Sequence, residues 1–90
     1  MIDKLIPGKC YKVFNKHRSK GYWNLASIEY IKGNSHSAFI KCYYGDTIIF
    51  LEKVTINDCT YANEFLKCLI RGKLIAYFGH WENQLIFEEL

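Results

Sequence analysis

Four cysteines and three histidines are the side chains of this chain best suited to metal binding or nucleophilic chemistry. No cysteine belongs to a Cys-x-x-Cys pair, and the histidines show no spacing typical of zinc ligands. A Cys–His nucleophile would also lack a surrounding motif to fix either partner. We therefore predict no metal site and no cofactor. Three thiols lie in apolar segments and are expected to pack as small hydrophobic side chains, namely Cys10, Cys42 and Cys68.

Other catalytic signatures are equally absent from the sequence. The nine acidic residues form no paired motif, and there is neither a phosphate-binding glycine loop nor a Gly-x-Ser-x-Gly elbow. A domain of 90 residues also has little room for a deep pocket of ligand size. We predict that the chain is not an enzyme.

Residues 15–24, "NKHRSKGYWN", are the strongest candidate for a binding site because cations and aromatics alternate around one glycine. In one interpretation, the cations meet phosphates or an acidic patch while an aromatic ring stacks on a base or anchors a protein interface. In the other, the aromatics cover the end of the core and the cations are solvated. The candidate residues are Lys16, Arg18, Lys20, Tyr22 and Trp23.

Two further places could contribute to the same surface. In "GHWEN", Trp81 beside His80 is either an exposed interface anchor or a plug for the open end of a barrel. Tyr61 lies in a variable stretch that would flank the first long loop. Tyr43 and Tyr44 are adjacent, so on a strand they would face opposite sides, one in the core and one exposed.

Length and composition predict one domain, residues 1–90, that is intracellular and cytoplasmic. There is no apolar run long enough for a membrane span or a signal peptide. Residue types with AT-rich codons (Phe, Tyr, Met, Ile, Asn and Lys) number 41, against 13 with GC-rich codons (Gly, Ala, Arg and Pro), which suggests a bacteriophage or low-GC bacterial gene. Residues 1–44 have net charge +6 and residues 45–90 have net charge −3, an asymmetry that could steer a partner.

Alternating apolar residues predict a mainly β fold. Strands are expected over residues 9–15, 37–44, 47–56, 73–78 and 84–90, and a bulged strand, or else a short helix, over 23–33. Residues 57–73 fit either a helix or a loop followed by a strand that ends at an Arg71-Gly72 hairpin turn. Many short strands at close spacing indicate a small barrel or sandwich.

The second half of the chain resembles the SH3-like barrel family, including bacterial and phage-borne members. The resemblance rests on four dipeptides at turns and strand ends in residues 44–90: Gly45-Asp46, Leu51-Glu52, Gly72-Lys73 and Phe78-Gly79. It implies a small SH3-like barrel with an enlarged first loop that has its own strands. The tryptophan and the proline of peptide-binding members are missing, so we expect no proline-rich ligand.

These observations lead to two functional hypotheses. The first is a non-catalytic, protein-binding module, a small phage-type protein that inhibits or modulates a bacterial host protein, one that could itself handle nucleic acid. The alternative is a small barrel that binds nucleic acid directly through the loop at residues 16–23, for which net charge +3 is a weak footprint. A third option is a structural subunit that associates through an exposed edge strand.

Overall fold

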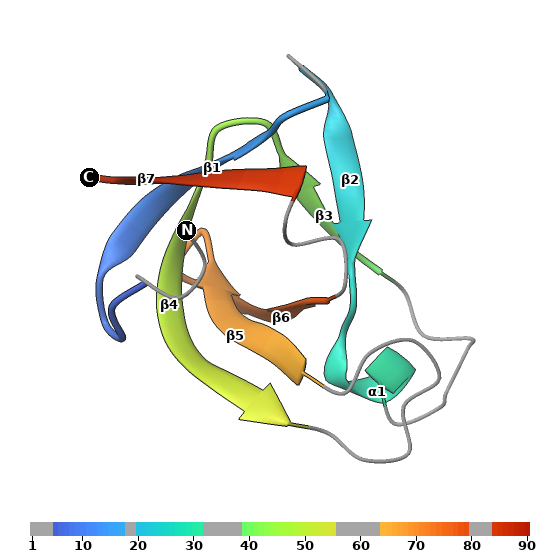
Figure 1. The fold of residues 1–90 in the computed structure, drawn as a ribbon. Coiled ribbons are helices and arrows are strands. Elements are labelled where there is room, and N and C mark those ends of the chain that lie inside the picture. The colour runs from blue at the N-terminus through green and yellow to red at the C-terminus, as the bar shows by residue number, and fades with distance from the viewer. Residues whose placement is uncertain (1–4, 18–19, 32–38, 56–63, 80–83) are drawn as a thin grey trace.

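The computed structural model describes residues 5–17, 20–31, 39–55, 64–79 and 84–90. They form an all-β fold with one four-residue helix, and Figure 1 shows two antiparallel sheets around a common interior. The larger sheet has the strand order β6-β5-β4-β1-β7, and the smaller pairs β2 with β3. The elements are β1 (Cys10–Asn15), β2 (Tyr22–Leu25), α1 (Ile28–Ile31), β3 (Ile40–Tyr43), β4 (Asp46–Thr55), β5 (Glu64–Ile70), β6 (Leu74–Phe78) and β7 (Leu85–Glu89).

The alternation that predicts β1 is confirmed in the structure. Tyr11 and Val13 are buried, whereas Lys12 between them is exposed. Strand β4 is long enough to pair with β1 at one end and β5 along its length, and its register with β5 shifts between Phe50 and Glu52. Such an irregularity bends a strand and increases its twist. In Figure 1, β4 accordingly curves around the interior, which gives the larger sheet a barrel-like shape.

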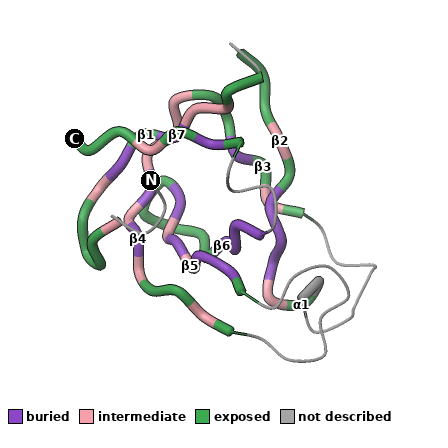
Figure 2. The backbone as a smooth tube through the Cα atoms, in the orientation of Figure 1, coloured by how far each residue is buried: buried purple, intermediate pink, exposed green. Residues whose placement is uncertain are grey.

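The interior between the two sheets is apolar. Figure 2 shows that buried positions alternate with exposed and intermediate ones along the strands. Phe78 is fully buried, and its ring meets Phe87 edge-on with centroids 5.7 Å apart. Each large apolar side chain removed from water in this way contributes about 1.5–3 kcal/mol before the entropic cost of folding. The two sheets therefore share one core.

Strands β2 and β3 are attached to this core by their inward residues. Leu25 and Cys42 are fully buried, and Trp23 packs against the same cluster. Just beyond β2, Ala26 exchanges two backbone hydrogen bonds with Tyr77 of β6, with N···O distances of 3.3 and 3.0 Å. These contacts fix the two-stranded sheet relative to the larger one.

Two sequence predictions need correction. Residues 23–33 are not one bulged strand: β2 ends at Leu25 and α1 follows Ser27, a residue type favoured at helix starts. The helical alternative for residues 57–73 is wrong for the described part, because residues 64–70 form strand β5. A hairpin turn at Arg71-Gly72 and the final strand are confirmed, but the connection has three residues, 71–73, and not the expected two, because Ile70 pairs with Leu74. Among the described residues, no helix has the length and apolar character needed to cross a membrane.

Candidate functional site

The outward side chains of β2 and β3 form a continuous surface, which we call the tyrosine face. It consists of Tyr22, Asn24, Lys41 and Tyr43. In the register of the two strands, Tyr22 lies opposite Tyr43 and Asn24 opposite Lys41. Because strand side chains alternate between faces, the intervening Trp23 and Cys42 point inward, where both contact the core.

Aromatic and cationic groups contact each other on the tyrosine face. The rings of Tyr22 and Tyr43 are tilted by 55° with centroids 5.7 Å apart. The Lys41 ammonium lies 4.6 Å from the centroid of the Tyr22 ring, within the range of a cation–π contact. Both tyrosines remain exposed, at 42% and 46%. Large rings held in place but open to solvent are the features that interface hot spots share.

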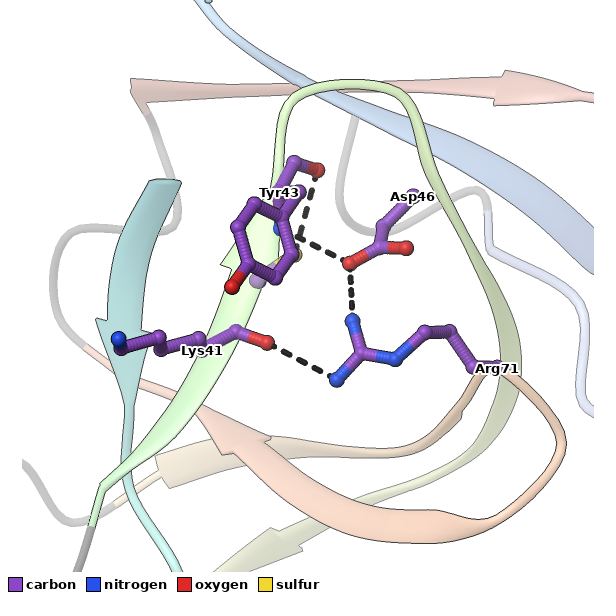
Figure 3. Close-up of polar contacts among 5 residues, drawn as sticks. Lys41, Tyr43, Asp46 and Arg71 are labelled. Carbon is purple, nitrogen blue, oxygen red and sulfur yellow. Dashed lines mark hydrogen bonds and ion pairs between the residues drawn. The ribbon is translucent and has the colours of Figure 1, made fainter. Parts of the chain in front are cut away.

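Arg71 reaches this surface from the β5–β6 hairpin and is held there by Asp46 at the start of β4 (Figure 3). One guanidinium nitrogen, Nη1, pairs with Oδ2 of Asp46, and Nη2 donates to the carbonyl oxygen of Lys41 at 3.2 Å. The same Asp46 oxygen accepts the backbone N–H of Tyr43 at 2.8 Å. The guanidinium carbon is then 5.8 Å from the centroid of the Tyr43 ring. Asp46 thus orders both the arginine and the end of β3.

The backbone at Arg71 is unusual for an arginine. Arg71 has φ of +53° and Gly72 has φ of +69°, the left-handed values of the two central residues of a type I′ β-turn, which the Lys73 N–H closes by donating to the Ile70 carbonyl at 3.0 Å. The first position of such a turn favours asparagine, aspartate or glycine, because other residues are sterically strained at positive φ. The turn would therefore form more easily with another residue at position 71, whereas only the arginine makes the contacts with Asp46 and Lys41.

A substitution at this turn distinguishes a contribution of Arg71 to stability from a role of its guanidinium on the tyrosine face. We expect Arg71→Asn to change the free energy of unfolding by less than about 1 kcal/mol. The relief of backbone strain at position 71 should offset the loss of the partly exposed ion pair between Arg71 and Asp46. Urea denaturation of the two proteins side by side measures the difference. A loss of several kcal/mol would show that Arg71 is primarily a structural residue.

Aromatic side chains continue around the β3–β4 turn. Tyr44 packs edge-on against Phe14 of β1, with centroids 4.9 Å apart, and remains 39% exposed. Its backbone N–H donates to the carbonyl of Gly21, which ties the turn to the start of β2. The expectation that one of Tyr43 and Tyr44 would enter the core is wrong, because β3 ends at Tyr43 and Tyr44 belongs to the turn.

A hollow lies beside the tyrosine face at the start of β2. It has a volume of about 470 Å³ and is lined by Gly21, Tyr22, Trp23 and Asn24. The indole Nε1 of Trp23 is buried and has no hydrogen-bond partner among the described residues. Among the described residues, one short stretch of chain forms the walls of the hollow, which is open to the surface.

The structure describes half of the eight binding residues proposed from the sequence. Lys16, Lys20 and Tyr22 are exposed, and Trp23 is half-buried against the core. The other four lie outside the described residues: Arg18, Tyr61, His80 and Trp81. Sequence reasoning missed Lys41 and Arg71, although the alternation in "IKCY" could have placed Lys41 and Tyr43 on one face.

The described cysteines pack in or at the edge of the apolar core, as small apolar side chains do. Cys42 and Cys68 are fully buried, and Cys10 is half-buried. Burial raises the pKa of the Cys42 thiol from 9.0 to about 12, with a smaller contribution from the charge of Asp46. Burial likewise raises the pKa of Cys68. Within the described ranges, no group of three or more His, Cys, Asp or Glu side chains could hold a metal ion.

Thiol reactivity should follow this burial. In a Cys59→Ser background at pH 8, we expect Cys10 to react with a thiol reagent at least about 100-fold faster than Cys42 or Cys68, because the buried thiols form little thiolate. All three should react at similar rates in denaturant. Mass spectrometry of timed samples would identify each site. Rapid labelling of Cys42 in the folded protein would contradict the burial described above.

Stability should also fall at alkaline pH. The folded protein keeps the protons on Cys42 and Cys68 above about pH 9, where the unfolded chain begins to lose them. Each of these thiols should therefore lower the free energy of unfolding by about 1 kcal/mol per pH unit above that value. Urea denaturation at pH 7 and pH 10 measures the loss. A Cys42→Ala/Cys68→Ala control corrects for other titrating groups and should show a shallower decline.

Searches against known proteins returned no matching family model, no matching curated protein and no matching solved structure. The expected all-β, small barrel-like architecture is confirmed by the structure itself. Membership of the SH3-like family stays a prediction.

Proposed function

We propose that this chain is a non-catalytic binding module that attaches to a protein partner through the tyrosine face. The observation that supports this best is the pair of exposed tyrosines, Tyr22 and Tyr43, on a two-stranded sheet that is anchored to the core. Tyrosine offers a large contact area with few rotatable bonds, so little conformational entropy is lost when it binds. Tyrosine and arginine are also enriched at interface hot spots.

The contacts of the tyrosine face favour a protein partner over nucleic acid. A surface that binds single strands without sequence preference combines open ring faces with a groove of cations. Here Lys41 occupies one face of the Tyr22 ring, and the surface also carries a carboxylate, that of Asp46, beside Arg71. The net charge of the whole chain is +3, which is small for a nucleic-acid-binding domain.

The bacteriophage origin and the inhibition of a bacterial host protein stay predictions from the sequence, and they give the first place to look for a partner. A module of this kind acts by covering a surface that its partner needs for another contact. The total accessible surface of the chain is 5735 Å², which is sufficient for one standard interface of about 800 Å² per partner.

Affinity capture from a nuclease-treated bacterial extract tests the proposal. The tagged wild-type chain is compared with Tyr22→Ala/Tyr43→Ala and with Ile75→Ala, a matched control at an exposed apolar residue (38% exposed) on the outer face of the larger sheet. We expect one stoichiometric protein to be retained by the wild type and the control and lost by the double variant. Equal retention by all three, or recovery of nucleic acid alone, would contradict the proposal.

A further inference from the structure

We infer that the tyrosine face binds an acidic segment of its protein partner, with Arg71 and Lys41 contacting the carboxylates of that segment. This inference rests on the proposed function and specifies the chemistry of the partner. It draws on the distribution of paired and unpaired charges, on the geometry of the Arg71 guanidinium, and on the strained turn that presents it.

Two cations around the tyrosine face, Lys20 and Lys41, have no ion-pair partner among the described residues. On the larger sheet, Lys9 pairs with Glu89 and Lys53 pairs with Glu64, each at 3.0 Å. The Lys41 ammonium instead lies over the ring of Tyr22, and no carboxylate pairs with it in the described part of the chain. Lys20, two residues before Tyr22, is also exposed and has no ion pair among these residues. This side of the molecule is therefore complementary to negative charge.

The Arg71 guanidinium is ordered but not saturated. It has five N–H donors, of which one on Nη1 bonds to Asp46 and one on Nη2 bonds to the Lys41 carbonyl. The three remaining donors have no partner among the described residues, and 36% of the side chain is exposed. A planar guanidinium held in this way can offer two parallel donors to a second carboxylate, which is the strongest form of this contact.

The strained backbone of the β5–β6 turn indicates that Arg71 has a functional role. Strained backbone residues cluster at functional sites, where the surrounding structure holds them in place. Arg71 adopts φ of +53° at a position that asparagine or glycine would fill with less strain. Asp46 and the Lys41 carbonyl fix the guanidinium beside Tyr43, on the same side as Lys41. The strain thus coincides with the only guanidinium on the described surface.

An acidic protein segment fits these features better than a phosphate backbone does. Asp46 beside Arg71 repels a continuous polyanion, whereas one carboxylate can approach the free edge of the guanidinium. The exposed ring of Tyr43 lies beside the guanidinium and that of Tyr22 lies next to Tyr43, so both provide apolar contact for the neighbouring residues of a peptide. Phosphates would meet the same cations, so nucleic acid is included as an outcome of the test.

NMR titration of the isotope-labelled full chain tests the inference with three probes. The first is a short peptide with one glutamate on each side of a tyrosine, the second is its glutamine counterpart, and the third is oligothymidylate. We expect the acidic peptide to shift the Arg71 side-chain signal and the amides of β2 and β3. Its affinity should fall about tenfold in Arg71→Asn and in Lys41→Ala, but remain unchanged in the control Lys53→Ala. Arg71→Lys should recover only part of the loss, because a lysine lacks the planar pair of donors.

Other outcomes would overturn the inference in distinguishable ways. Equal binding of the acidic and neutral peptides at the tyrosine face would remove the charge preference and leave the proposed function standing. Tighter binding of oligothymidylate at the same residues would overturn both. Shifts that leave Arg71 and Lys41 unaffected, or an absence of peptide binding, would overturn the inference alone, provided that the capture experiment still yields a protein lost by Tyr22→Ala/Tyr43→Ala.

Discussion

Alanine at both Tyr22 and Tyr43 is expected to weaken the binding of the captured partner by at least about 100-fold. A hot-spot tyrosine contributes about 2 kcal/mol or more when truncated, and two such losses exceed a factor of 100 even if they are not fully additive. The rings lie opposite each other in the β2–β3 register, so a partner that covers one covers the other. Calorimetry or surface plasmon resonance with the purified partner measures the change.

The double variant should keep the fold. Both side chains are more than 40% exposed, and the cross-strand pair that they form contributes at most about 1 kcal/mol to stability. Thermal melting of the variant beside Ile75→Ala checks this. If both variants melt normally and bind equally well, the tyrosine face is not the binding surface.

Phe78→Ala is expected to lower the free energy of unfolding by about 3–5 kcal/mol, the largest effect of any single substitution proposed here. The side chain is fully buried, and its removal would leave a cavity beside Phe87 in the shared core. A domain of this size has a total stability of only about 5–15 kcal/mol. The melting temperature should therefore fall by roughly 15 °C or more.

An exposed residue provides the comparison for Phe78. Ile86→Ala removes a large apolar side chain of β7 that is 41% exposed, and it should cost less than about 1 kcal/mol. Urea denaturation of both variants gives the two values on one scale. Similar losses would mean that the core is not centred between the two sheets as described.

Local sequence patterns were sufficient to predict most strands. The β-branched and aromatic run of β4 and the alternation in β1 each follow from one strand's own residues. The Arg71-Gly72 turn follows from its position between two apolar runs. Such features depend on near neighbours in the chain, so they are visible in the sequence.

Segments that are covered on both faces were harder to predict. In β5, Leu66, Cys68 and Ile70 face the shared core, but Phe65 is also buried, on the other face, against Tyr77. Apolar residues on both faces remove the alternation that distinguishes a strand from a helix. Helix α1 has only four residues, too few to show a helical period.

The candidate site could be predicted only in part, because it is assembled from distant segments. Tyr22 was identified from its own neighbourhood of cations and aromatics. The contact between Asp46 and Arg71 joins residues 25 positions apart. It places the guanidinium on the tyrosine face only because β3 lies beside it. The sequence contains no signal for the pairing of β2 with β3, and that pairing creates the tyrosine face.

Site-specific photo-crosslinking tests most directly whether the tyrosine face contacts the partner. A photoreactive phenylalanine analogue is placed at position 22, at position 43 or at position 75, and each protein is irradiated in bacterial extract with and without nuclease treatment. We predict that positions 22 and 43 yield a crosslink to the same protein, while position 75, on the larger sheet, yields none. A crosslink from position 75 alone, or crosslinks to nucleic acid before nuclease treatment and to no protein afterwards, would contradict the proposed binding surface.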